Sequence, residues 1–189
     1  MSLFNRAEVI DNNFRRFVRS GKLPKARTKI QLDQVSESKA DLISIFESQV
    51  CSRHMDIAAR LLKDQGACFY TIGSSGHEGN AVFGKVFSYK DIAFLHYRSV
   101  PFFLERSKQL FGSTPIYDTA LSFMASSEDP ISGGRHKVIG SKELNIPPQT
   151  STIASHLPKA VGTAFSIDRA KDLNIHERKL ADNSIVLCS

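Results

Sequence analysis

Apolar side chains recur at the spacing of one helix face between Ser38 and Gly66. Ser38 followed three residues later by Asp41 is typical of a helix start, because the serine oxygen accepts a bond from a free backbone N–H and the acid favours the first turn. Gly66 is typical of a helix end. The pattern predicts a long helix whose core-facing stripe consists of Leu42, Phe46, Val50, Met55, Ala58 and Leu62.

Shorter apolar runs of strand type occupy residues 67–72, 92–95 and 184–188, and helical patterns occupy residues 77–87, 100–111, 114–125 and about 153–173. Strands that alternate with helices predict an α/β fold, a parallel sheet flanked by helices. In such folds ligands bind at the carboxyl ends of the strands. Tyr97 and Arg98, which follow the run at 92–95, are therefore candidate site residues.

Residues 126–150 form a long segment without periodicity that is rich in proline and glycine. A loop of this length inside a compact domain is usually functional. His136 lies in it between Arg135 and Lys137, a cluster of cations suited to phosphate or carboxylate. The pattern leaves a functional role and a structural role for His136 open.

Composition places the chain among ordinary globular proteins, with 41% apolar and 23% charged residues in 189. No apolar stretch is long enough to span a membrane, and three cysteines without a C-x-x-C pair favour a reducing cytoplasm. The net charge of +6 is concentrated between Arg15 and Lys29, where no acid occurs. This basic extension, residues 1–37, is either an arm for RNA, membrane or an acidic partner or a solvated tail. The nearly neutral remainder argues against a dedicated nucleic-acid surface.

Three phosphate, dinucleotide and metal motifs are incomplete. The segment Gly79–Val86 approaches the phosphate-binding pattern GxxxxGK[ST], but Val86 follows Lys85 where a hydroxyl is needed for magnesium. The glycines at 73, 76 and 79 do not form GxGxxG, and His77-Glu78 lacks the second histidine of HExxH. Arg98 remains a candidate clamp for a diphosphate, with a structural ion pair as the alternative.

Five segments resemble, in the same order, motifs of the α component of thiamine diphosphate-dependent 2-oxo acid dehydrogenases, the E1 decarboxylase family. The resemblance extends from about Asp41 to Ser189, about four-fifths of the chain. The segments are the opening helix (53–66), the G-[QE]-E-[AG] turn (Gly76-His77-Glu78-Gly79), the Q-Y-R segment (His96-Tyr97-Arg98), the loop before the pyrimidine site (140–145) and S-P-L-A-T-Q-[IL]-P-[QHK]-A-[VT]-G (151–162). Thr152 stands where the last motif has proline.

The resemblance implies a thiamine diphosphate-binding fold and assigns roles to five residues. Tyr97 and Arg98 fall on the pair that contacts the cofactor diphosphate, and Ser151 and Ile153 fall on the residues that meet the aminopyrimidine. Ile153 is expected to act as an apolar wedge beneath the bent cofactor, and His136 is the candidate catalytic histidine. The magnesium ligands of the family are expected after Ser189. Residues 38–189 are accordingly expected to be the N-terminal part of this domain, truncated before its later strands.

The implied activity is oxidative decarboxylation of a 2-oxo acid, most simply of the branched-chain, 3-methyl-2-oxobutanoate type, with acyl transfer to a lipoyl group. The implied partners are a β-type half in the same or a separate chain, a lipoyl-bearing transacylase and further copies of the chain. Residues 1–189 alone are expected to be inactive. Two alternatives stay open, a noncatalytic basic binding module and a pyruvate-type specificity.

Overall fold

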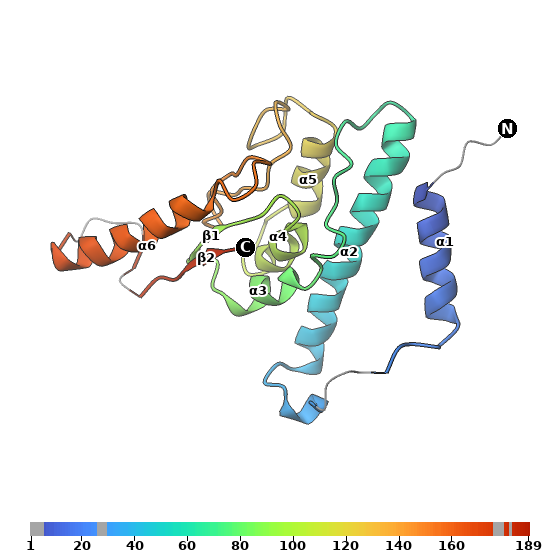
Figure 1. Cartoon of the computed structure of the whole chain (residues 1–189), viewed down its shortest axis with the longest axis horizontal. Helices are drawn as coiled ribbons and strands as arrows, with labels where there is room; N and C mark the ends of the chain where they lie inside the picture. The colour runs from blue at the N-terminus through green and yellow to red at the C-terminus, as the bar shows by residue number, and fades with distance from the viewer. Residues whose placement is uncertain (1–5, 26–29, 176–179, 182) are drawn as a thin grey trace.

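The structure is a computed structural model that describes residues 6–25, 30–175, 180–181 and 183–189. Part of the basic segment, including Arg27 and Lys29, lies outside the described residues. In order along the chain, the elements are α1 (Arg6–Arg19), the short 3-10 helix η1 (Leu32–Gln34), α2 (Lys39–Asp64), α3 (Asn80–Val86), β1 (Ile92–Phe94), α4 (Val100–Ser107), α5 (Pro115–Phe123), α6 (Leu157–Asp172) and β2 (Val186–Cys188) (Figure 1).

The long helix α2 begins and ends where the sequence predicts. The Ser38 side chain accepts a bond from the Asp41 backbone N–H at 3.1 Å, and the Asp41 carboxylate accepts one from the Ser38 N–H at 3.3 Å. The helix stops before Gly66, whose φ of 75° lies in the left-handed region that glycine favours. Helix α2 then contacts α1, α3, α4 and α5, so it organises the helical part of the molecule.

The buried face of α2 differs from the predicted apolar stripe. Phe46 is 60% exposed and Ala58 is exposed, whereas the helix buries Ile45, Ser48, Ser52, Met55, Asp56 and Ala59. Half of these residues are polar. They can be buried because neighbouring elements supply hydrogen-bond partners for them. Ser48, for example, donates to the buried carboxylate of Glu105 on α4 at 2.7 Å.

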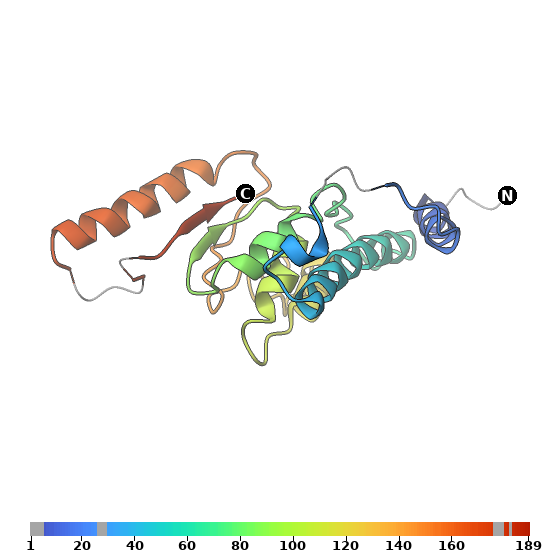
Figure 2. The ribbon, with the colours of Figure 1, turned by 90° about the horizontal axis from the view of Figure 1, so that it is seen from below.

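The sheet of the described residues is small and parallel. Strands β1 and β2 pair with Ile92 opposite Val186 and Phe94 opposite Cys188. Strands β1 and β2 lie inside the predicted strand runs at 92–95 and 184–188, and helices flank them (Figure 2). This arrangement agrees with the predicted α/β class, although the sheet has only two strands in the described residues. The predicted strand at 67–72 is wrong: the segment is irregular, and it is tied to the end of α5 by the Phe69 N–H, which donates to the Phe123 carbonyl at 3.1 Å.

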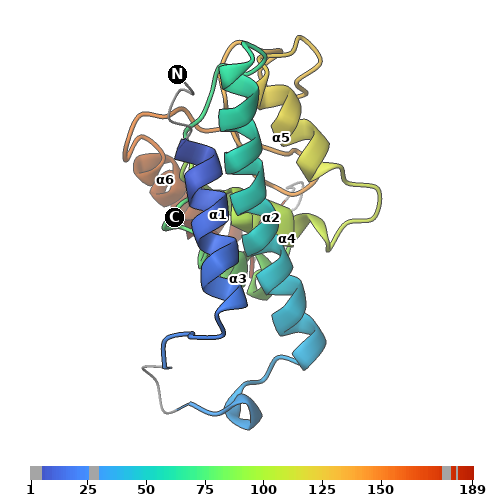
Figure 3. The ribbon, with the colours of Figure 1, turned by 90° about the vertical axis from the view of Figure 1, so that its right-hand side faces the viewer.

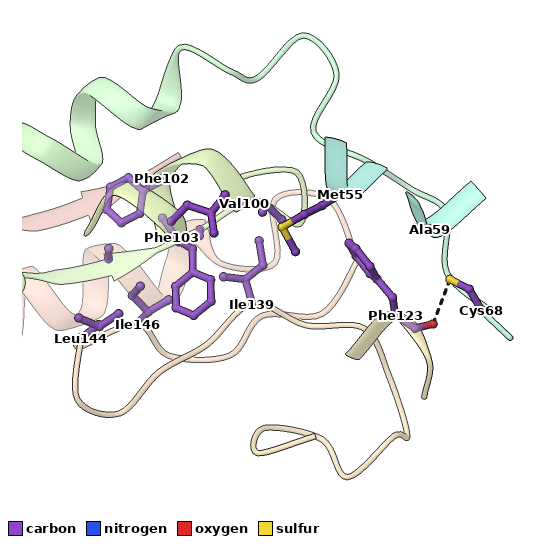
Figure 4. Packing of buried hydrophobic residues seen from close by; sticks show 13 residues of the cluster. Met55, Ala59, Cys68, Val100, Phe102, Phe103, Phe123, Ile139, Leu144 and Ile146 are labelled. Atoms are coloured by element: carbon purple, nitrogen blue, oxygen red, sulfur yellow. Dashed lines mark hydrogen bonds between the residues drawn. The ribbon is translucent and has the colours of Figure 1, made fainter. Parts of the chain in front are cut away.

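The apolar core lies between α2, β1, α4 and the long loop. Phe102, Phe103 and Leu95 are almost fully buried there with Ile139 and Ile146 (Figure 4). Because burying an aromatic or branched side chain stabilises a fold by about 1.5–3 kcal/mol, this cluster holds the elements around β1 in place.

The predicted long loop is confirmed, and the helix after it is shorter than expected. Between Met124 and His156 the structure has no helix or strand, only an isolated antiparallel bridge between Ser141 and Ile146. Helix α6 begins at Leu157, four residues after its predicted start, and extends away from the rest of the molecule (Figures 1 and 2). No helix in the described part of the chain has both the length and the apolar character needed to cross a bilayer.

Candidate functional site

Tyr97 and Arg98 lie just beyond the carboxyl end of β1, as the sequence predicts. The Arg98 backbone N–H donates to Nδ1 of His96 at 3.2 Å, and its Nη1 donates to the Gly73 carbonyl at 2.6 Å. The guanidinium carbon also lies 5.3 Å from the centre of the Tyr97 ring. Among the described residues no carboxylate forms an ion pair with Arg98. One nitrogen is therefore anchored, and the other donors of this half-buried side chain remain available.

Two histidines stack beside this pair. The rings of His77 and His96 are parallel within 2°, with centres 5.1 Å apart. Burial is the main cause that lowers the pKa of His96, and the positive charges of His77, Arg98 and His156 act in the same direction. Because Nδ1 of His96 accepts the Arg98 N–H, the proton of the neutral ring sits on Nε2.

Ser189, the residue after β2, lies beside His96 at the same site. The Ser189 hydroxyl accepts a bond from the His96 N–H at 3.4 Å and lies 3.1 Å from the Ser99 hydroxyl. The Ser189 carbonyl accepts a bond from Nε2 of His156 at 2.9 Å, and His156 is buried at the start of α6. The sheet thus brings the ends of both strands and the start of α6 together.

His136 and Ser151, predicted separately from the sequence, form a second pair. Nε2 of His136 lies 3.1 Å from the Ser151 hydroxyl, and the ring of Tyr70 meets the His136 ring edge-on at 6.1 Å. Ile153, two residues beyond, is 74% exposed. Most of this side chain is therefore accessible to a bound molecule.

The irregular segment 70–74 connects the two pairs. Tyr70 contacts His136, the Ile72 carbonyl accepts a bond from Nζ of Lys137 at 2.9 Å, and the Gly73 carbonyl accepts the bond from Arg98. The segment predicted as a strand therefore serves as a frame between the two halves of the candidate site. Its hydrogen bonds go to side chains of the site rather than to a sheet.

Asp56 of α2 holds the segment 70–74 in place through hydrogen bonds to Ser74. Its carboxylate, 3% exposed, accepts bonds from the Ser74 backbone N–H at 2.8 Å and from the Ser74 hydroxyl at 3.1 Å. The Ser74 hydroxyl also contacts that of Ser52. A Cβ at Gly73 would collide with the Asp56 carboxylate, so a larger residue here would have to displace that carboxylate from Ser74.

Lys137 is a buried cation that sequence analysis noted only as a neighbour of His136. Its ammonium donates to the Ile72 carbonyl and lies 5.1 Å from the centre of the Phe123 ring. Burial lowers its pKa to about 8, against the favourable charge of Asp56. The ammonium is committed to the frame, so Arg98 is the better placed of the two cations to meet a ligand.

The depressed pKa of Lys137 predicts a stability that rises with pH. Between about pH 8 and the ordinary lysine pKa of 10.5 the unfolded chain keeps a proton that the folded chain has released. The unfolded state binds more protons there, so the free energy of unfolding increases with pH across this window, by about 1–3 kcal/mol. Chemical denaturation of the wild type and of Lys137→Met at steps through the window measures the difference. A difference that stays constant with pH would contradict the prediction.

The sequence prediction missed the buried polar residues of α2 for an identifiable reason. Ser48, Ser52 and Asp56 recur at every fourth position of α2, which places them on one helix face. A polar stripe of this kind on a long helix is a signal of a buried network, whereas an apolar stripe indicates only the apolar part of a buried face. His96 was noted only as part of a motif, although it connects β1, Arg98 and Ser189.

Neither a metal centre nor a known relative identifies the site. Within the described residues, no three histidine, cysteine or acidic side chains come close enough to hold a metal ion. Compared with known proteins, the chain matches no family model and no curated protein closely enough to show a relationship.

Proposed function

We propose that residues 38–189 are part of a thiamine diphosphate-dependent 2-oxo acid dehydrogenase of the E1 type, and that the candidate site is its cofactor half-site. The observation that supports this most is the arrangement of Arg98. It stands at the carboxyl end of a parallel strand, anchored through one nitrogen to Gly73, with the rest of its planar fork unpaired among the described residues. Ligands of α/β folds bind at this position.

A diphosphate suits the donors around Arg98. A guanidinium matches two phosphate oxygens at once, and hydrogen bonds between charged groups are about twice as strong as neutral ones. His96 in its neutral form offers a second donor at Nε2, and the Tyr97 hydroxyl offers a third. The described residues offer no cage for magnesium, and we assign it no ligand here.

The second pair supplies the contacts for the remainder of the cofactor. In this proposal the Ser151 backbone meets the aminopyrimidine, and the exposed Ile153 supports the bent cofactor as an apolar wedge. His136, 3.1 Å from the Ser151 hydroxyl, is within reach of that hydroxyl as a proton donor or acceptor beside the reacting end. When bound, thiamine diphosphate supplies the electron sink for decarboxylation, while these residues supply orientation.

The proposed reaction is the oxidative decarboxylation of a 2-oxo acid of the 3-methyl-2-oxobutanoate type, with the acyl group passed to a lipoyl group. The proposal includes a β-type half, a lipoyl-bearing transacylase, a homo-oligomer and a cytoplasmic location. Pyruvate-type specificity is the alternative for the substrate, and comparing the two 2-oxo acids with the complete enzyme decides between them.

Nuclear magnetic resonance titration of the chain tests the half-site directly. Thiamine diphosphate should shift the backbone amide signals of both 97–99 and 151–153, inorganic diphosphate should shift only the first group, and thiamine should shift only the second. Binding in the millimolar range suffices, because a half-site provides only part of the contacts. If saturating thiamine diphosphate moves neither group of signals, the proposed cofactor site is wrong.

A basic binding module is the second candidate, and α1 favours it. The described part of the extension carries an exposed cationic surface formed by Arg6, Arg15, Arg16, Arg19, Lys22 and Lys25. Deleting residues 1–37 separates the candidates. A cofactor enzyme keeps the thiamine diphosphate shifts after the deletion, whereas a basic module loses its acidic ligand and shows no cofactor-dependent shifts before or after it.

A further inference from the structure

A cavity of about 320 Å³ lies between α1, α2 and the turn that precedes α3. Helix α1 runs alongside α2 in the opposite direction (Figure 3). Ile10 and Phe14 of α1 and Ile57 of α2 provide apolar walls. The volume equals about ten water-sized groups at about 30 Å³ each, which is the lower end of the range for small-molecule sites.

Two opposite charges line this cavity without pairing with each other. Within the described residues Arg53 forms no hydrogen bond and one ion pair, of 3.7 Å with Asp56, which is too long for a hydrogen bond. Asp56 itself is engaged by Ser74. Glu78 accepts one bond, from the Gly76 N–H at 2.8 Å on Oε2, and its other oxygen has no donor among the described residues.

We infer that this cavity binds the zwitterion of an apolar α-amino acid. The ligand carboxylate would meet the fork of Arg53, the ammonium would meet the free oxygen of Glu78, and the side chain would lie against Ile57 and the α1 residues. A ligand with only a carboxylate would place a negative charge near Glu78 without an ammonium to pair with it. A ligand with only an ammonium would place a positive charge near Arg53 without a carboxylate to pair with it. A ligand with both charges and an apolar body meets these two charges and the apolar walls, and Gln49, His54 and Ser75, which also line the cavity, add further polar groups.

The inference is independent of the thiamine diphosphate proposal, because none of the cavity residues belongs to the cofactor half-site. The cavity nevertheless touches the same framework. Glu78 follows His77, and Arg53 precedes Asp56 by one helical turn. A ligand held there would rest against the segment that carries the Arg98 anchor.

Titration calorimetry of the full chain with L-leucine, 4-methylpentanoate and 3-methylbutylamine tests the assignment. Leucine should bind, and each of the other two, which lacks one charge, should bind about tenfold more weakly, since one charge-assisted bond corresponds to about a factor of ten or more. Arg53→Gln should weaken leucine binding about tenfold and leave the affinity for 3-methylbutylamine unchanged. Glu78→Gln should weaken leucine binding about tenfold and leave the affinity for 4-methylpentanoate unchanged. Arg60→Gln, an exposed change on the same helix, is the matched control.

Three results would overturn the inference: no saturable heat with leucine up to about 10 mM, equal affinity for 4-methylpentanoate, or unaltered leucine binding by Arg53→Gln. Far-ultraviolet circular dichroism of each variant identifies any that fails to fold. Ile57→Trp provides a second test that leaves both charges in place, because the larger ring fills the cavity and should abolish leucine binding. Unchanged binding by this variant also rejects the site.

Discussion

Replacing Arg98 by alanine is expected to raise the dissociation constant for thiamine diphosphate about tenfold or more, because a hydrogen bond to a charged group contributes about 1.5–3 kcal/mol and each 1.4 kcal/mol is a factor of ten. The side chain is held ready by its bond to the Gly73 carbonyl at 2.6 Å, so little ordering cost offsets the lost contact. The titration described for the half-site measures the constant for both proteins.

Two further substitutions separate the charge of Arg98 from its shape. Arg98→Lys keeps the charge and loses the planar fork, so its affinity should lie between those of the wild type and Arg98→Ala. Arg60→Ala removes an exposed arginine from α2 and should leave the affinity unchanged, which controls for the net charge of the chain. Equal affinities of Arg98→Ala and the wild type would refute the assignment of Arg98 to the diphosphate.

Replacing Asp56 by alanine is expected to lower the free energy of unfolding by about 3 kcal/mol. The change leaves the buried Ser74 N–H and hydroxyl without their acceptor, and each hydrogen bond to a charged group contributes about 1.5–3 kcal/mol. Burial raises the pKa of Asp56, so its removal also relieves a desolvation cost, and the net loss is smaller than the sum of the two bonds. Urea denaturation monitored by circular dichroism gives the value.

Asp64→Ala is the matched control, because Asp64 is an exposed acid near the end of the same helix, and its loss should change the free energy of unfolding by less than about 0.5 kcal/mol. A double-mutant cycle with Ser74→Ala then isolates the pair. Asp56→Ala should cost less in the Ser74→Ala background, since the hydroxyl contact is already gone and only the bond from the backbone N–H of residue 74 is still lost. A loss for Asp56→Ala no larger than for Asp64→Ala would show that the carboxylate does not hold the frame, and additive losses would show that the Ser74 hydroxyl bond does not contribute.

Local signals in the sequence predicted α2, β1, β2 and the long loop, and they did not predict α1 (Arg6–Arg19). The ends of α2 follow from side chains within a few residues of each end, at Ser38, Asp41 and Gly66, so the sequence alone predicts them. The strands β1 and β2 lie within predicted apolar runs, and the long loop lacks any periodicity. The same reasoning failed for residues 67–72, where an apolar run is satisfied by contacts with α5 and with site residues instead of a ladder.

Some residues of the candidate site could be predicted from the sequence, and the residues that surround them could not. Tyr97, Arg98, His136, Ser151 and Ile153 could be named from the sequence: the first two from their place after a strand, His136 from its place in the long loop, and the last two only through the family resemblance. Their surroundings could not. Asp56 lies 18 residues before Ser74 and Lys137 lies 65 residues after Ile72, yet each forms a hydrogen bond with that residue.

What the sequence determined by itself is therefore what depends on neighbours along the chain: the caps of α2, the positions of the strands and the residues that follow β1. What only the tertiary structure decided is which polar groups are buried together. A buried hydrogen-bonding group requires a partner, and the partner is chosen by proximity in space, not along the chain. For this reason the sequence shows Ser48, Ser52 and Asp56 only as a polar stripe on α2, and the fold supplies their partners, Glu105 and Ser74.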